Sequence, residues 1–73
     1  GNIEEAKVYF MDALKHKPGM ADSHYFLARI AFEENNKDIA KENINKISES
    51  SINGLSTITI DDLHSLSLAI DQL

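Results

Sequence analysis

An internal offset of 34 residues constrains this chain more than any other feature of its sequence. Two segments at this separation share the spacing of a small residue, a larger apolar residue and another apolar residue. The paired positions are Ala6 and Ala40, Phe10 and Ile44, Ala13 and Ile47, with Lys7 and Lys41 in the same register. Self-similarity at a spacing of this size indicates stacked helical repeats. The sequence therefore predicts a repeat architecture.

Apolar periodicity predicts helices throughout the first two thirds of the chain. Residues 3–16 carry apolar side chains at helical spacing, and Pro18 and Gly19 end that helix. Residues 21–34 form a second helix. The short Asn35-Asn36 turn then leads into a third helix from about Lys37 and favours an antiparallel neighbour.

A last helix is predicted over residues 59–73. Thr59 and Asp62 approximate a capping box at its start. Its apolar face consists of Leu63, Leu66, Ile70 and Leu73. We therefore predict an all-α fold, an antiparallel array of helix–turn–helix units with about four helices.

The connection before this last helix has two interpretations. Asn53-Gly54 can cap the C-terminus of the third helix. It can also form a two-residue hairpin turn, with Thr57 to Ile60 alternating like a strand. The cap is favoured, because a lone hairpin would have no sheet to join.

The segment from Ala6 to Pro18 resembles the second helix of a tetratricopeptide repeat, with its Ala, aromatic, Ala and closing Pro. That family repeats at about 34 residues. Places that hold Trp, Leu, Gly and Tyr in the family's first helix are occupied here by His24, Leu27, Ala28 and Ala31, of which only Leu27 is the family's residue. The resemblance implies the second helix of one repeat in residues 1–19, a helix pair in 20–52, and a loop with a capping helix in 53–73.

Composition argues against several classes of function. The 73-residue chain has a net charge of −5 and no basic cluster, which argues against nucleic-acid binding. The absence of cysteine excludes disulfides and thiolate metal sites. No apolar run approaches the roughly 20 residues that span a bilayer, so no membrane association is predicted.

Residues capable of chemistry are few and scattered. His16, His24 and His64 form no His-x-x-x-His pair. We expect His16 to favour a helix C-terminus and His24 to occupy the place of a packing aromatic. Asp61 and Asp62 are explained by a helix start. We therefore predict no enzymatic activity, no metal and no cofactor.

The best candidate for binding is a stripe on the second helix, because in the tetratricopeptide family this side lines the concave groove that receives peptides. The predicted stripe comprises Asp22, Tyr25, Phe26, Arg29, Phe32 and Glu33. Aromatic residues beside a single Arg are typical of binding hot spots. The alternative is that the aromatic residues pack on neighbouring helices and the charges are only solvated.

These features predict a non-catalytic module that binds a peptide segment or a protein surface. The alternative is structural self-association into a homo-oligomer, because about three repeats are needed for a stable stack and shorter arrays leave apolar ends. Val8 and Met11, on the otherwise polar side of the first helix, are the candidate contacts for that association.

Overall fold

Four α-helices make up the computed structural model, which describes residues 2–73. They are α1 (Ile3–His16), α2 (Ala21–Glu33), α3 (Lys37–Asn45) and α4 (Ile60–Asp71), with a 3₁₀ turn, η1 (Glu49–Ser51), between α3 and α4. The predicted all-α fold with about four helices is confirmed. Because residues 2–73 contain no strand, the hairpin interpretation of Thr57 to Ile60 is wrong.

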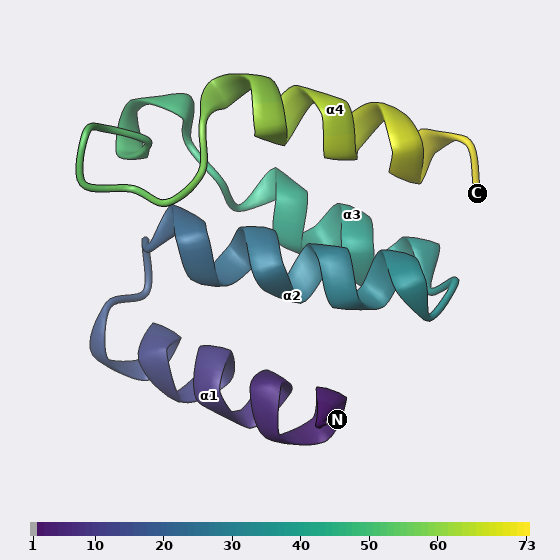
Figure 1. Ribbon diagram of the computed structural model, residues 1–73, viewed down its shortest axis with the longest axis horizontal. Coiled ribbons are helices and arrows are strands. Elements are labelled where there is room, and N and C mark those ends of the chain that lie inside the picture. Colours follow the sequence, from purple (N-terminus) through teal and green to yellow (C-terminus); the bar gives the residue numbers. More distant parts are fainter. Residues whose placement is uncertain (1) are drawn as a thin grey trace.

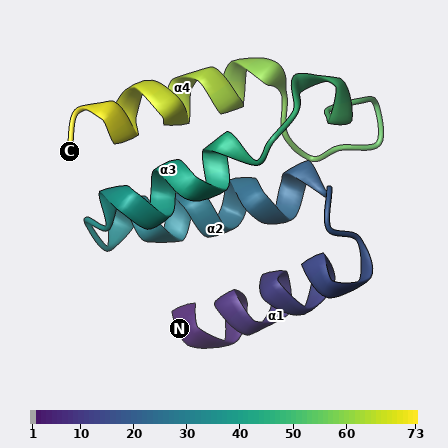
Figure 2. The same ribbon diagram turned by 180° about the vertical axis from the view of Figure 1, so that it is seen from behind.

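Successive helices run antiparallel, and α2 lies at the centre (Figure 1). α1 and α4 lie on opposite sides of α2 in this view, whereas α3 lies behind α2 and comes to the front when the molecule is turned (Figure 2). α2 packs against each of the other three helices, and most extensively against α3. Several sides of α2 are therefore covered by other helices, and this determines which residues of the predicted stripe are buried.

Local sequence signals set most of the helix boundaries. Asn35 adopts φ 58°, a left-handed conformation that Asn tolerates, and so turns the chain from α2 into α3. The Asn36 side chain then caps α3 by accepting a hydrogen bond from the Ile39 N–H. At α4, Thr59 and Asp62 form the predicted capping box, each side chain accepting from the other residue's backbone N–H.

α3 is shorter than the sequence suggested. It ends at Asn45, well before Asn53-Gly54, so the prediction that this pair caps α3 is wrong. Instead the Asn53 side chain accepts a hydrogen bond from the Leu55 N–H at 2.8 Å, and its carbonyl accepts from the Ser56 N–H. The pair thus stabilises a local turn, because Asn side chains compete well for nearby backbone groups.

The core joins small residues of α2 and α3 to aliphatic residues of α4. Ala28 and Ala40 are both fully buried, which is consistent with a close approach of α2 and α3. From α4, the predicted apolar face is buried at Leu63, Leu66 and Ile70. Leu73 lies beyond the end of α4 and is 41% exposed, so its assignment to that face is wrong.

Candidate functional site

The residues of the predicted stripe have different environments. Tyr25 is only 7% exposed and belongs to the core, while Phe26 and Phe32 are half-buried and pack against it. Arg29 and Glu33 are exposed and lie 3.9 Å apart, Nε to Oε1. That any of these residues contacts a partner stays a prediction. Tyr25, however, has little solvent-exposed surface that a partner could contact.

Asp22, the sixth member of the stripe, ties α2 to the segment before α4. One of its carboxylate oxygens, Oδ2, accepts hydrogen bonds from the Thr57 N–H at 2.9 Å and from the Thr57 hydroxyl at 2.7 Å. The next residue, Ile58, is 4% exposed and belongs to the core. Asp22 therefore anchors the chain where it enters the core, in addition to placing an acid in the first turn of α2.

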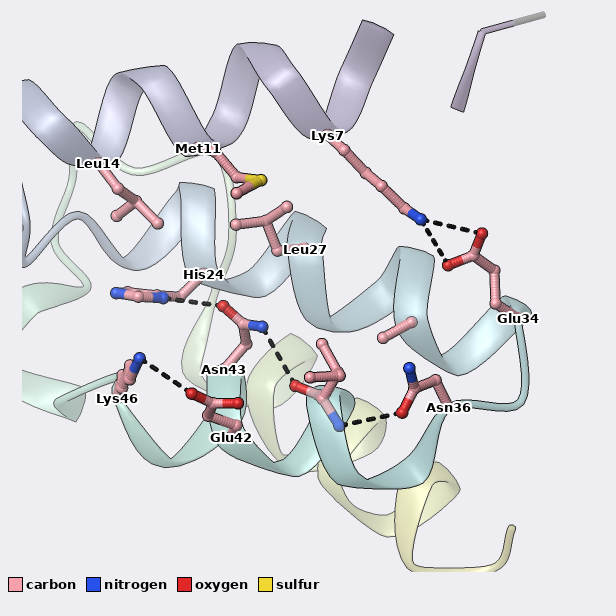
Figure 3. Close-up of a pocket in the computed structure, with 12 residues that line it drawn as sticks. Lys7, Met11, Leu14, His24, Leu27, Glu34, Asn36, Glu42, Asn43 and Lys46 are labelled. Atoms are coloured by element: carbon pink, nitrogen blue, oxygen red, sulfur yellow. Dashed lines mark hydrogen bonds and ion pairs between the residues drawn. The ribbon is translucent and has the colours of Figure 1, made fainter. Parts of the chain in front are cut away.

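A groove of about 360 Å³ lies across α1, α2 and α3 (Figure 3). Leu27 and Ala31 line it from α2, and these residues are two positions away from Arg29 and Glu33, respectively. Residues two apart do not share a helix face, so the groove lies on a different side of α2 from the exposed end of the predicted stripe. Its apolar lining is Met11, Leu14, Leu27, Ala31 and Ile39.

Ion pairs lie along the edge of this groove. Lys7 of α1 reaches Glu34 just after α2, with 2.9 Å between Nζ and Oε1. The hydrogen bond to Glu34 raises the pKa of the Lys7 ammonium above its ordinary 10.5. On the opposite edge, Lys46 and Glu42 approach to 3.4 Å. These charges pair within the chain. The lining of the groove is therefore mainly apolar, with ion pairs at its edges.

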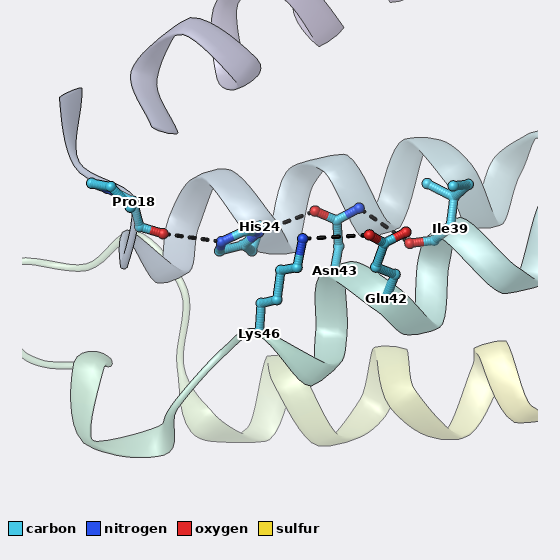
Figure 4. Close-up of polar contacts among 6 residues, drawn as sticks. All are labelled: Pro18, His24, Ile39, Glu42, Asn43 and Lys46. Atoms are coloured by element: carbon cyan, nitrogen blue, oxygen red, sulfur yellow. Dashed lines mark hydrogen bonds and ion pairs between the residues drawn. The ribbon is translucent and has the colours of Figure 1, made fainter. Parts of the chain in front are cut away.

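His24 forms part of the groove floor and joins three segments of the chain (Figure 4). Its Nδ1 lies 3.1 Å from the Asn43 side-chain oxygen, and its Nε2 lies 3.2 Å from the Pro18 carbonyl oxygen. Asn43 in turn donates to the Ile39 carbonyl at 3.1 Å. Each ring nitrogen of this side chain, which is only 6% exposed, thus faces an oxygen acceptor, and the single N–H of a neutral imidazole can donate to one of the two. Its structural role agrees with the expectation that His24 occupies a packing position.

The remaining histidines have ordinary surface partners. His16 Nδ1 lies 3.1 Å from the Asp12 carbonyl oxygen within α1, and His64 Nε2 lies 3.5 Å from Glu49. Within residues 2–73, no three His, Cys, Asp or Glu side chains gather closely enough to hold a metal ion. The helices of that same part of the chain include none long and apolar enough to cross a membrane.

Comparison with known proteins gives no further guide. No family model matches the chain, and neither a curated protein nor a solved structure matches it. The functional argument therefore depends on the geometry described above.

Sequence reasoning missed the groove because three helices contribute to it. The sequence indicated Met11 only as a candidate contact for self-association, on the otherwise polar side of the first helix. It is 57% exposed, and its side chain points toward Leu27 across the groove (Figure 3). The available signal was Lys7, whose equivalent in the third helix is Lys41. Met11 follows Lys7 by four residues and therefore lies on the same face of α1.

Proposed function

We propose that this chain is a non-catalytic protein-interaction module of the tetratricopeptide-repeat type, which binds a peptide segment or protein surface. The observation that carries the proposal is the groove across α1, α2 and α3, whose apolar lining is partly exposed at Met11. Exposed concave apolar surface with polar edges is the usual form of a site for another molecule.

The groove favours a segment with an apolar anchor. Met11 supplies a flexible thioether side chain, and Leu14 and Leu27 are half-buried around it. A leucine, methionine or phenylalanine of the partner, set into this lining, would remove apolar area from water at about 25 cal/mol per Å². Methionine at a binding surface also adapts to partners of different shape.

Charges at the groove edge add orientation. A partner carboxylate can compete for Lys7 or Lys46, and a partner cation can compete for Glu34 or Glu42, but each exchange breaks a pair already formed within the chain. Such exchanges contribute little net affinity. The preferred partner is therefore an amphipathic segment whose apolar residue dominates affinity.

Selection from a displayed library of random 12-residue peptides, with the folded chain as bait, tests the proposal. We expect enriched peptides to carry an apolar anchor and to lose binding to a Met11→Lys variant. Val8→Lys is the matched control, because Val8 is 66% exposed on the same helix but does not line the groove.

Arg29→Ala distinguishes the groove from the predicted stripe. If the selected peptides bind Met11→Lys normally but lose affinity for Arg29→Ala, the site is the stripe and the groove proposal is wrong. If selection enriches no peptide with affinity better than roughly 100 μM, peptide binding itself is refuted. Circular dichroism of each variant establishes that the fold is retained.

A further inference from the structure

Asn53 and Gly54 lie in the loop between η1 and α4, and neither residue lines the groove across α1, α2 and α3. Both are exposed, and the next residue, Leu55, is 95% exposed. Because the pair does not cap α3, its hydrogen bonds are available to form a local turn. This turn has chemical consequences that a helix cap would not have.

The Asn53 side chain is bent over the backbone that follows it. Its Oδ1 accepts a hydrogen bond from the Leu55 N–H at 2.8 Å. This bond closes a ring of atoms that contains both the Asn53 Cγ and the Gly54 nitrogen, so the turn keeps these two atoms close. Two more bonds hold the turn, from the Asn53 N–H to Ser56 Oγ at 3.1 Å and from the Ser56 N–H to the Asn53 carbonyl at 3.0 Å. A reaction between Cγ and the Gly54 nitrogen is therefore intramolecular and pre-organised.

The same hydrogen bond activates the side-chain amide of Asn53. Attack of a nitrogen on Cγ moves negative charge onto Oδ1, and the Leu55 N–H already donates to this oxygen. Within residues 2–73, neither the Gly54 N–H nor the Asn53 side-chain nitrogen takes part in a hydrogen bond. Both the attacking nitrogen and the nitrogen that must leave are therefore accessible to solvent.

We propose that Asn53 is a self-modification site, at which the chain converts its own asparagine into aspartate or isoaspartate. Hydroxide removes the Gly54 amide proton, and the nitrogen forms a bond to Cγ. The Asn53 side-chain nitrogen takes up a proton from water and leaves as ammonia, which completes a succinimide ring.

Water then opens the succinimide ring in one of two ways. Cleavage of the bond between Cγ and the Gly54 nitrogen gives aspartate, and cleavage of the bond between the main-chain carbonyl carbon and that nitrogen gives isoaspartate. In total, one asparagine and one water become one carboxylic acid and one ammonia. No group is oxidised or reduced, and the only co-reactant is water.

The other asparagines of the chain lack this arrangement, because each precedes a residue whose side chain shields the attacking nitrogen. Asn43 also lies inside α3, where the N–H of the next residue belongs to the helical hydrogen bonds. Its side chain is already held by the Ile39 carbonyl and His24. The residues that follow the other asparagines are Ile3, Asn36, Lys37, Ile44 and Lys46. We therefore expect the reaction to be selective for Asn53.

Isoaspartate would change the path of the chain just before α4. The main chain would run through Cγ and be one carbon longer, and the former main-chain carbonyl would become a carboxylate. The hydrogen bonds from Leu55 and Ser56 would then lose their present geometry. Thr57, the residue after Ser56, donates two hydrogen bonds to Asp22 of α2. We therefore expect conversion to loosen this anchor, and the amide of Thr57 to exchange its hydrogen faster.

Mass spectrometry of the full chain, kept folded at neutral pH and body temperature, tests the proposal. We expect the peptide that contains Asn53 to gain the mass difference between a hydroxyl and an amino group, while the other asparagines stay intact. Protein L-isoaspartate methyltransferase, which methylates the isoaspartyl carboxylate and not that of aspartate, identifies the isoaspartate product. The rate should increase from neutral to mildly alkaline pH, because the deprotonated Gly54 nitrogen is the attacking group.

Gly54→Ala is the decisive variant. A Cβ at Gly54 has no atom within 4 Å, and no glycine of residues 2–73 has a positive φ, so the fold is retained. The added methyl group shields the nitrogen, and conversion of Asn53 should slow severalfold. Gly19→Ala is the matched control, because a Cβ there also has no atom within 4 Å and no asparagine precedes it. Its rate should equal that of wild type.

The same chain unfolded in urea isolates the contribution of the turn. We expect Asn53 to convert at least as fast in the folded chain as in the unfolded chain, because the turn brings the reacting atoms together. Hydrogen exchange of the purified isoaspartate form then measures the anchor. An unchanged exchange rate at Thr57 would show that the loop accommodates the extra carbon, and the expected loosening would be wrong.

Three outcomes would overturn the proposed site. If Asn53 stays intact in the folded chain and converts only in urea, the fold protects this residue. If Gly54→Ala converts as fast as wild type, the Gly54 nitrogen is not the attacking group. If another asparagine converts faster than Asn53, the turn does not select the site. None of these results depends on peptide binding in the groove.

Discussion

Removing the Asp22 carboxylate should destabilise the fold, because it anchors the segment that leads into α4. Two hydrogen bonds from Thr57, at 2.9 and 2.7 Å, end on one charged oxygen. Bonds to charged groups contribute about 1.5–3 kcal/mol each, and half-exposure places both near or below the lower limit. An acid in the first turn of a helix adds about 0.3–1 kcal/mol. We expect Asp22→Ala to lower the free energy of unfolding by about 2–3 kcal/mol.

A matched control separates these contributions. Asp38 occupies the same place in the first turn of α3, so Asp38→Ala should cost only the helix-dipole part, about 0.3–1 kcal/mol. Thr57→Val removes the hydroxyl bond and leaves the backbone bond. Asp22→Ala and Thr57→Val combined should then cost less than the sum of the two single changes by about 1 kcal/mol.

Urea unfolding followed by far-ultraviolet circular dichroism measures the stability of wild type and of the four variants. For a domain of this size, a loss of about 2–3 kcal/mol corresponds to a fall in Tm of roughly 10–20 °C. The reasoning is refuted if Asp22→Ala unfolds within about 0.5 kcal/mol of wild type, or if it costs no more than Asp38→Ala. In that case Asp22 would be available to a partner, as the predicted stripe requires.

Three further perturbations examine other parts of the fold. Tyr25→Ala should cost about 3–5 kcal/mol in chemical denaturation because the ring is buried, whereas Arg29→Ala should change stability by less than about 0.5 kcal/mol. Deleting residues 59–73 removes three buried aliphatic side chains, and calorimetry should show that cooperative melting is lost. The pKa of Lys7 is raised, so its stabilising effect is complete below its ordinary 10.5 and declines as pH rises through the folded value. The difference in urea stability between wild type and a Lys7→Met variant should therefore stay constant up to about pH 10 and shrink only as the pH rises above about 10.5.

The helices were predictable because their signals are local. The first helix was predicted over residues 3–16, the same bounds as α1, since an apolar face and the following Pro18 define it. The α4 capping box involves Thr59 and Asp62, only three residues apart. The end of α3 was harder, because a serine-rich segment follows it and Asn53-Gly54 has several uses in a chain.

The candidate site was less predictable because distant segments decide it. Asp22 is engaged by Thr57, 35 residues later, and this contact has no short-range signature. Tyr25 is apolar enough for a groove or a core, and it is buried in the core cluster to which α4 contributes Leu66 and Ile70. The groove across α1, α2 and α3 depends on how far apart α1 and α3 lie, which residue spacing does not specify.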